Sequence, residues 1–146
     1  MTPECRCTGG IIQRHLAKLS GPLLDRSDLH LEVPAVPYQE LRGTDRAVGS
    51  AEMRQRVLAA RATQTQRGFC NAQIPSNRLR ELCALDAAGE RTLEMAVRKL
   101  GLSARSHDRI LKVARTIADL GGHADVQARH VAEAVHYRSL DRSYWS

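Results

Sequence analysis

The second half of the chain repeats one arrangement: a residue that can cap a helix, apolar residues at helical spacing, and usually a glycine where the pattern ends. Asp86, for example, can accept hydrogen bonds from free backbone amides, and Gly101 can adopt the left-handed conformation that closes many helices. Signals that agree in this way predict a helix far better than any one of them alone. They predict helices over residues 77–83, 87–100, 104–120 and 126–138, capped by Ser76, Asp86, Ser103 and Asp125.

The apolar residues of these helices predict which faces pack together. In the three longer helices they recur every three or four residues and so lie along one side. We therefore expect a small all-α bundle of about 70 residues, near the lower limit for a core that is stable by itself. The residues expected to face inward are Leu93, Ala96, Val97, Leu100, Ile110, Val113, Ala114, Ile117, Leu120, Ala128, Val131, Ala132 and Val135.

The first half of the chain is less regular. An apolar stripe predicts a helix over residues 10–20, which the pair Gly21-Pro22 should interrupt. Polar and apolar residues then alternate over 28–33, as in a half-buried strand. Because a lone strand cannot satisfy its backbone groups, we expect the sheet that it would join to lie outside this chain.

A polar connector over 41–49 leads to one more predicted helix, over residues 51–67, with Ser50 as its cap and Gly68 at its end. This helix is rich in arginine and glutamine. Its apolar seam is narrow, which is typical of a bridging helix rather than a core helix. The seam consists of Met53, Val57 and Ala60.

The charged, aromatic and cysteine residues limit the kinds of function that this chain can have. The chain has 22 Lys and Arg against 16 Asp and Glu, a net charge of +6, which favours polyanion partners or reflects solvated helix faces. Aromatic residues make up only 3% of the chain, too few for a surface that stacks on bases. The four cysteines show no pairing pattern, and no secretion signal or membrane span is evident, so we expect a reducing, cytoplasmic setting.

The sequence holds no complete site for nucleotide hydrolysis. It has no Walker A pattern, the glycine-rich loop that cradles phosphates and ends in Lys-Ser or Lys-Thr. No acidic run that would bind a metal follows a predicted strand, and no Ser-His-Asp or Cys-His arrangement can be argued from spacing. The chain is therefore not expected to turn over ATP by itself.

Two arginines occupy positions of interest. Arg26 lies in a tight segment just before the predicted strand, and Arg105 is the second residue of the helix that Ser103 should cap. A cation there opposes the helix dipole, and a bound phosphate would relieve the conflict. The competing interpretation for both is an ordinary surface arginine.

Several short runs stand in a fixed order along nearly the whole chain. They are CRCT (5–8), QRH (13–15), LSGPLLDR (19–26), DLHLEVP (28–34), NA (71–72), CALD (83–86), LSAR (102–105), RILKVARTIADL (109–120) and HVAEAVHYR (130–138). Together they resemble the C-terminal part of the ComM/YifB family of magnesium-chelatase-like AAA+ ATPases. The chain departs from that family at Gly9, where proline is common, and at Ser27, where isoleucine or phenylalanine is usual.

The resemblance implies a fold, a division into parts and two site residues. It implies a mainly α chain: a C-terminal helix–strand remnant of the AAA+ α/β core over 1–42, a connector and bridging helix over 43–69, and a helical lid over 70–146. Arg26 would be the arginine finger, which reaches the nucleotide of a neighbouring subunit, and Arg105 the sensor 2 arginine of its own subunit. ATP and magnesium would bind only in the full-length protein, a ring-shaped homo-oligomer with helicase-like work on DNA in competence.

Other interpretations remain open at this stage. The chain could be a stand-alone basic helical module that binds nucleic acid, or a non-functional gene remnant. It starts downstream of the family's Walker motifs, as a truncated gene, a degenerate copy or a piece cut from a longer chain would. Cys5 and Cys7 would be half of a zinc site, so we expect free thiols and no metal, and we expect Cys70 and Cys83 to be buried as small apolar residues. For the isolated chain we expect at most weak, nonspecific DNA binding and no membrane contact.

Overall fold

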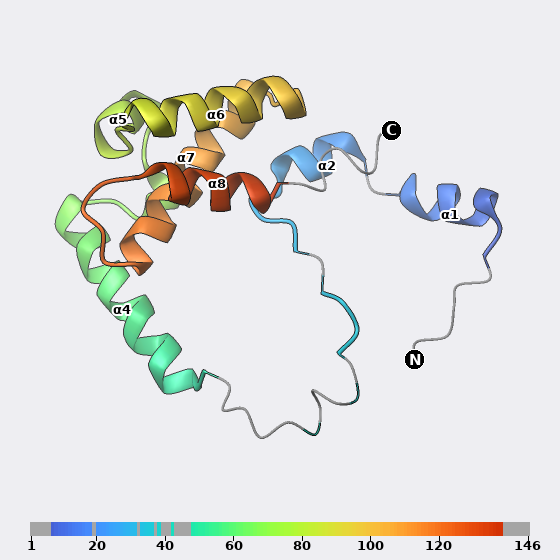
Figure 1. The fold of residues 1–146 in the computed structure, drawn as a ribbon, viewed down its shortest axis with the longest axis horizontal. Coiled ribbons are helices and arrows are strands. Elements are labelled where there is room, and N and C mark those ends of the chain that lie inside the picture. The colour runs from blue at the N-terminus through green and yellow to red at the C-terminus, as the bar shows by residue number, and fades with distance from the viewer. Residues whose placement is uncertain are drawn as a thin grey trace.

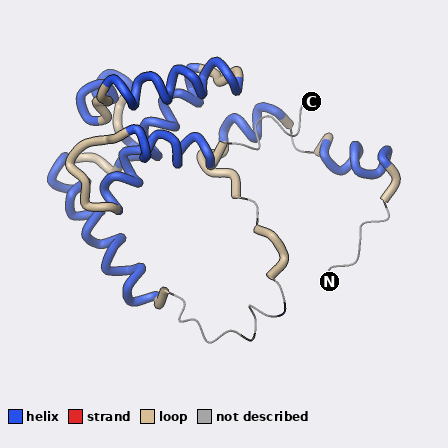
Figure 2. Tube along the Cα trace, in the orientation of Figure 1, coloured by secondary structure: helices blue, strands red, loops and turns tan. Residues whose placement is uncertain are grey.

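The computed structural model describes residues 7–18, 20–31, 33–36, 38, 42 and 48–138. Within these residues the structure is mainly helical, with loops between the helices, as Figures 1 and 2 show, and the mainly α fold is confirmed. In chain order the elements are α1 (Gly9–Leu16), α2 (Gly21–Arg26), α4 (Ser50–Arg67), the short 3-10 helix η1 (Asn71–Gln73), α5 (Ser76–Leu82), α6 (Ala87–Leu100), α7 (Ala104–Leu120) and α8 (Ala128–His136).

The helix α7 is the centre of the bundle. It packs against α4, η1, α5 and α8, and α8 also packs against α6 (Figure 1). Its inward side carries Ile110, Ala114 and Ala118, none of which has measurable exposure. Small residues at two of these positions let neighbouring helices approach closely. The rest of the buried apolar core comprises Ile74, Leu79, Cys83, Leu93, Leu111, Val126, Val131 and Ala134.

Two of the predicted helices have the bounds and caps that we expect. The Asp86 side chain accepts a hydrogen bond from the Gly89 amide at 2.7 Å, and α6 ends at Gly101, whose φ of 62° is left-handed. Ser103 caps α7 in the same way, through the amide of Ser106 at 3.2 Å. These side-chain caps satisfy amides that would otherwise lack a partner in the first helical turn.

Other helix starts differ from the predictions. Ser50 and Ser76 are the first residues of their helices, and Gly49 and Pro75 take the cap positions, neither with a side-chain hydrogen bond. Asp125 is likewise not a cap, because α8 starts two residues later than predicted. There Gln127 and His130 form a reciprocal capping box, in which the Gln127 amide donates to His130 Nδ1 at 3.0 Å.

Most of the residues predicted to face inward are buried or half-buried. Ala132 and Leu120 are exposed instead, because each lies at the edge of its helix's apolar face. The first helix is also shorter than predicted, since α1 ends at Leu16 rather than at residue 20. After it, Gly21-Pro22 begins a new helix, α2, because proline fits the first turn of a helix, where no amide donor is needed.

The strand predicted over 28–33 is not formed in the part of this segment that the structure describes. The segment is an extended loop in which Leu29, Leu31 and Val33 are 49%, 65% and 84% exposed. A strand needs a neighbour to pair with, and the described residues contain none. Instead the His30 amide donates to the carbonyl of Tyr137, at the end of α8, at 2.7 Å.

Candidate functional site

Arg26 and Arg105 belong to elements that the structure joins directly. Arg26 is the last residue of α2, and Arg105 lies in the first turn of α7. The Asp25 side chain, near the end of α2, links α2 to the start of α7, and we call this contact the joint. Its Oδ1 accepts hydrogen bonds from Ser106 Oγ at 2.8 Å and from Ser103 Oγ at 3.1 Å. Both candidate arginines are exposed at this joint, and neither forms a salt bridge with another described residue.

The negative charge of the Asp25 carboxylate also complements the positive end of the α7 helix dipole. The free amides at a helix start favour an anion, and here the chain places one of its own beside them. The hydrogen bond from Ser106 is the largest influence that holds the pKa of Asp25 below its usual value, and the charges of Arg138 and Arg105 act in the same direction. The unfavourable interaction of the Arg105 charge with the helix dipole is therefore partly offset by the Asp25 carboxylate.

The lowered pKa of Asp25 makes the joint sensitive to acid. A carboxyl group whose pKa falls on folding stabilises the folded form above its unfolded pKa of about 3.9, and that contribution is lost as the pH falls through the lower, folded value. We expect an NMR titration of the Asp25 carboxyl carbon to give a midpoint below about 3.9. Ser106→Ala should raise the midpoint, because it removes the principal hydrogen bond. A wild-type midpoint at or above the peptide value would contradict this account of the joint.

The residues after Arg26 are fastened to the bundle as well. Arg109, on α7, donates to the backbone carbonyl of Arg26 and pairs with Asp28 at 2.9 Å. Arg138, only 1% exposed, donates to the carbonyl of Ser27 at 2.7 Å. Both donors belong to the helical bundle, since Arg109 lies in α7 and Arg138 follows the end of α8. The segment that presents Arg26 therefore has a defined position relative to the start of α7.

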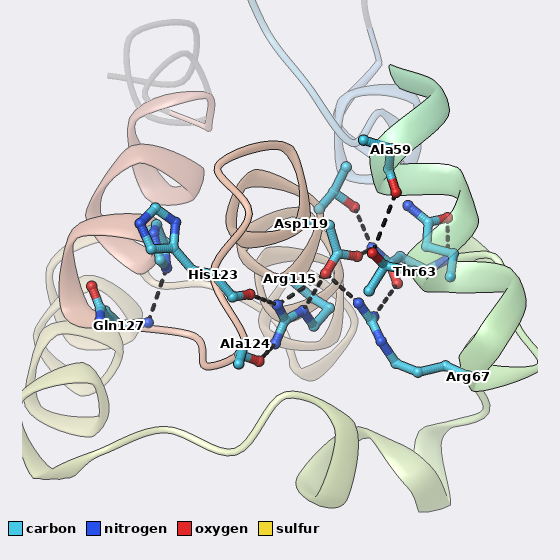
Figure 3. Close-up of polar contacts among 12 residues, drawn as sticks. Ala59, Thr63, Arg67, Arg115, Asp119, His123, Ala124 and Gln127 are labelled. Atoms are coloured by element: carbon cyan, nitrogen blue, oxygen red, sulfur yellow. Dashed lines mark hydrogen bonds and ion pairs between the residues drawn. The ribbon is translucent and has the colours of Figure 1, made fainter. Parts of the chain in front are cut away.

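A buried charge cluster holds α4 to the same bundle (Figure 3). The Asp119 side chain has no exposed surface, and it accepts from Arg115 Nε at 3.0 Å and Asn71 Nδ2 at 2.7 Å, and from Arg67. Arg115 is 4% exposed, and its two terminal nitrogens donate to the carbonyls of His123 and Ala124, each at 2.7 Å. The cluster thus links α4, η1, α7 and the loop after α7.

The cysteines of the described chain are free. Cys7 is exposed, whereas Cys5 lies outside the described residues. Cys83 is buried, and burial raises the pKa of its thiol to about 11, so it stays protonated as a small apolar residue. Cys70 is only half-buried, and its sulfur accepts from Arg61 Nη1 at 3.0 Å. No group of three potential metal ligands occurs among the residues that the structure describes.

Sequence reasoning proposed Arg26 and Arg105 as site residues, but it did not predict the residues that position them. Asp25, Ser106, Arg109 and Arg138 were not predicted as site residues. The available signal was local: a helix that begins with a serine cap has amides that attract a carboxylate, although the sequence does not say which one.

Among the described helices, none is long and apolar enough to cross a membrane.

Comparison with known proteins assigns the family. Residues 47–138 match the family model of the C-terminal part of magnesium chelatase subunit ChlI, and residues 1–41 match that of magnesium chelatase subunit ChlI. The chain is 47% identical to the competence protein ComM of Haemophilus influenzae over 90% of its own length and 26% of that relative's. It is 44% identical to the YifB protein of Escherichia coli over 94% of its own length and 28% of YifB. The chain thus spans about a quarter of these relatives, and it belongs to the magnesium-chelatase-like ComM/YifB family, whose C-terminal part it matches.

Proposed function

We propose that this chain is the C-terminal lid and inter-subunit element of a ComM/YifB-type AAA+ ATPase. In this proposal Arg26 is the arginine finger and Arg105 the sensor 2 arginine. One observation carries it: Asp25 joins the segment that bears Arg26 to the helix that bears Arg105, and leaves both guanidinium groups exposed. Ordinary surface arginines need no such joint.

The chemistry of the two side chains suits a nucleotide. A guanidinium group is always charged and donates hydrogen bonds in a planar fork that matches phosphate oxygens. Such a group stabilises the charge that develops on the transferred phosphoryl group. The chain has no Walker A pattern, so ATP and magnesium would bind only where the whole protein supplies that loop, and we expect no turnover by the chain alone.

The exposed apolar residues of the extended segment indicate where the rest of such a protein would pack. Leu29, Leu31 and Val33 alternate along the segment and face solvent. In the whole ATPase we propose that this segment becomes a half-buried strand of the α/β core, with Leu29, Leu31 and Val33 on its covered face. The assembly would be a ring of identical subunits in the cytoplasm. Its DNA-related work is inferred from the name of the relative, a competence protein.

An arginine finger acts on the nucleotide of a neighbouring subunit, and this can be tested by mixing subunits. In a full-length relative, alanine at the position that matches Arg26 should abolish ATP turnover, and so should a separate Walker A variant. Mixing the two inactive proteins should restore part of the turnover, because some interfaces then pair an intact Walker A loop with an intact finger. No recovery, from proteins that co-assemble, would show that Arg26 does not act across subunits.

A further inference from the structure

The helix α4 stands apart from the rest of the bundle over its first half. Figure 1 shows its C-terminal end against α7 and its N-terminal end projecting away. Ala60 and Gln64 are its only buried residues, and every residue from Ser50 to Ala59 is exposed. At least two turns of this helix are therefore open to a partner in the chain as it stands.

The charged residues of α4 and of the segment that follows it, up to residue 80, are almost all basic. No acidic residue occurs between Glu52 and Glu81. Of the arginines in that interval, the bundle engages two: Arg67 contacts Asp119, and Arg78 pairs with Glu81. The others are exposed and form no salt bridge within the described residues: they are Arg54, Arg56, Arg61 and Arg80.

Three of these exposed arginines are arranged around α4. Arg54 and Arg61 are seven residues apart, so they lie on the same side of the helix, roughly 10 Å apart along its axis. Arg56 follows Arg54 by two residues and points to the other side. Arg61 also donates to Cys70 Sγ at 3.0 Å, which leaves its other donors available. The helix thus carries guanidinium groups on two opposite sides.

We propose that the projecting half of α4 binds duplex DNA through its phosphate backbone. The major groove of B-DNA admits one α-helix, and its two walls are lined with phosphates, which arginines on opposite sides of a helix can reach. Only 3% of the chain is aromatic, and α4 has no aromatic residue, so stacking on unpaired bases is not available. The contact would be to phosphates and not to bases, and would not depend on nucleotide binding.

The test compares two variants of the whole chain with equal charge. One carries Arg54→Gln, Arg56→Gln and Arg61→Gln on α4; the other carries Arg91→Gln, Arg98→Gln and Lys99→Gln, all exposed positions on α6. Each triple removes three positive charges and takes the net charge from +6 to +3. Glutamine is a good helix former, and circular dichroism would show that the helices persist. Binding to a fluorescently labelled DNA duplex is then followed by anisotropy across a series of salt concentrations.

We expect the α4 triple to weaken duplex binding about tenfold or more and to reduce the salt dependence by about two to three phosphate contacts. The α6 triple should change binding far less, because Arg98 already pairs with Glu94 and Arg91 is next to Glu90 in the sequence. An equal loss in both variants would show a diffuse attraction to net charge and overturn the proposal. So would the absence of wild-type binding at low salt, or tighter binding to single-stranded DNA of the same length.

Discussion

Replacing Asp119 with alanine is expected to lower the free energy of unfolding by about 3–5 kcal/mol, a large part of the stability of a domain of this size. The Asp119 carboxylate is fully buried and is contacted by Arg115, Arg67 and Asn71. Its removal leaves the Arg115 guanidinium, itself 4% exposed, in the interior without its counter-charge. Urea denaturation of the chain, followed by circular dichroism, measures the effect.

A matched control separates this cluster from ion pairs in general. Glu94 pairs with Arg98 on the exposed side of α6 at 2.6 Å, and Glu94→Ala should cost about 0.5 kcal/mol or less. Asp119→Asn keeps the size of the side chain but not its charge, and should fall between the two. If Asp119→Ala cost no more than Glu94→Ala, the buried cluster would not be what fastens α4 to α7.

In a full-length relative with Walker motifs, alanine at the position that matches Arg105 is expected to reduce ATP turnover by about 100-fold or more, the loss typical of removing one preorganised donor to transition-state charge. The helical bundle itself should keep its stability, because Arg105 is exposed and the buried residues of α7, such as Ile110 and Ala114, are unchanged. Lysine at the same position should restore only part of the activity, since a point charge cannot reproduce the guanidinium fork.

Thermal unfolding of the same proteins provides the control for the Arg105 variants. An alanine variant at the position of Arg98, which is exposed on α6, should leave turnover unchanged and lower the melting temperature only slightly. Full ATP turnover in the full-length relative with alanine at the position of Arg105 would contradict the assignment of Arg105 as the sensor 2 arginine. A loss that only accompanied unfolding would point to a structural role for Arg105 instead.

The helices were predictable where local signals were redundant. For α6 and α7, a cap, an apolar period and a terminal break coincide, and the predicted bounds are those of the structure. For α8 the choice of cap failed, because Asp125 was favoured by residue type whereas the pair Gln127 and His130 closes the capping box. Side-chain pairing across three residues outweighed the preference of a single residue.

The contacts that position the candidate site could not be predicted from local patterns. Asp25 meets Ser106 across 81 positions of sequence, and Arg138 meets Ser27 across 111. No periodicity links residues so far apart, because the packing of the bundle brings them together. The alternation over 28–33 misled for a related reason: a strand forms only where it can pair with a neighbour, and the described residues contain no sheet.

The measurement that tests the proposed function most directly is the structure of a full-length relative with a bound non-hydrolysable ATP analogue and magnesium. The guanidinium groups at the positions that match Arg26 and Arg105 should each lie within hydrogen-bond distance of a phosphate oxygen, about 2.7–3.2 Å. The carboxylate that matches Asp25 should still join the two elements. Guanidinium groups that both point away from every bound phosphate would contradict the assignment of this chain as a nucleotide-responsive lid.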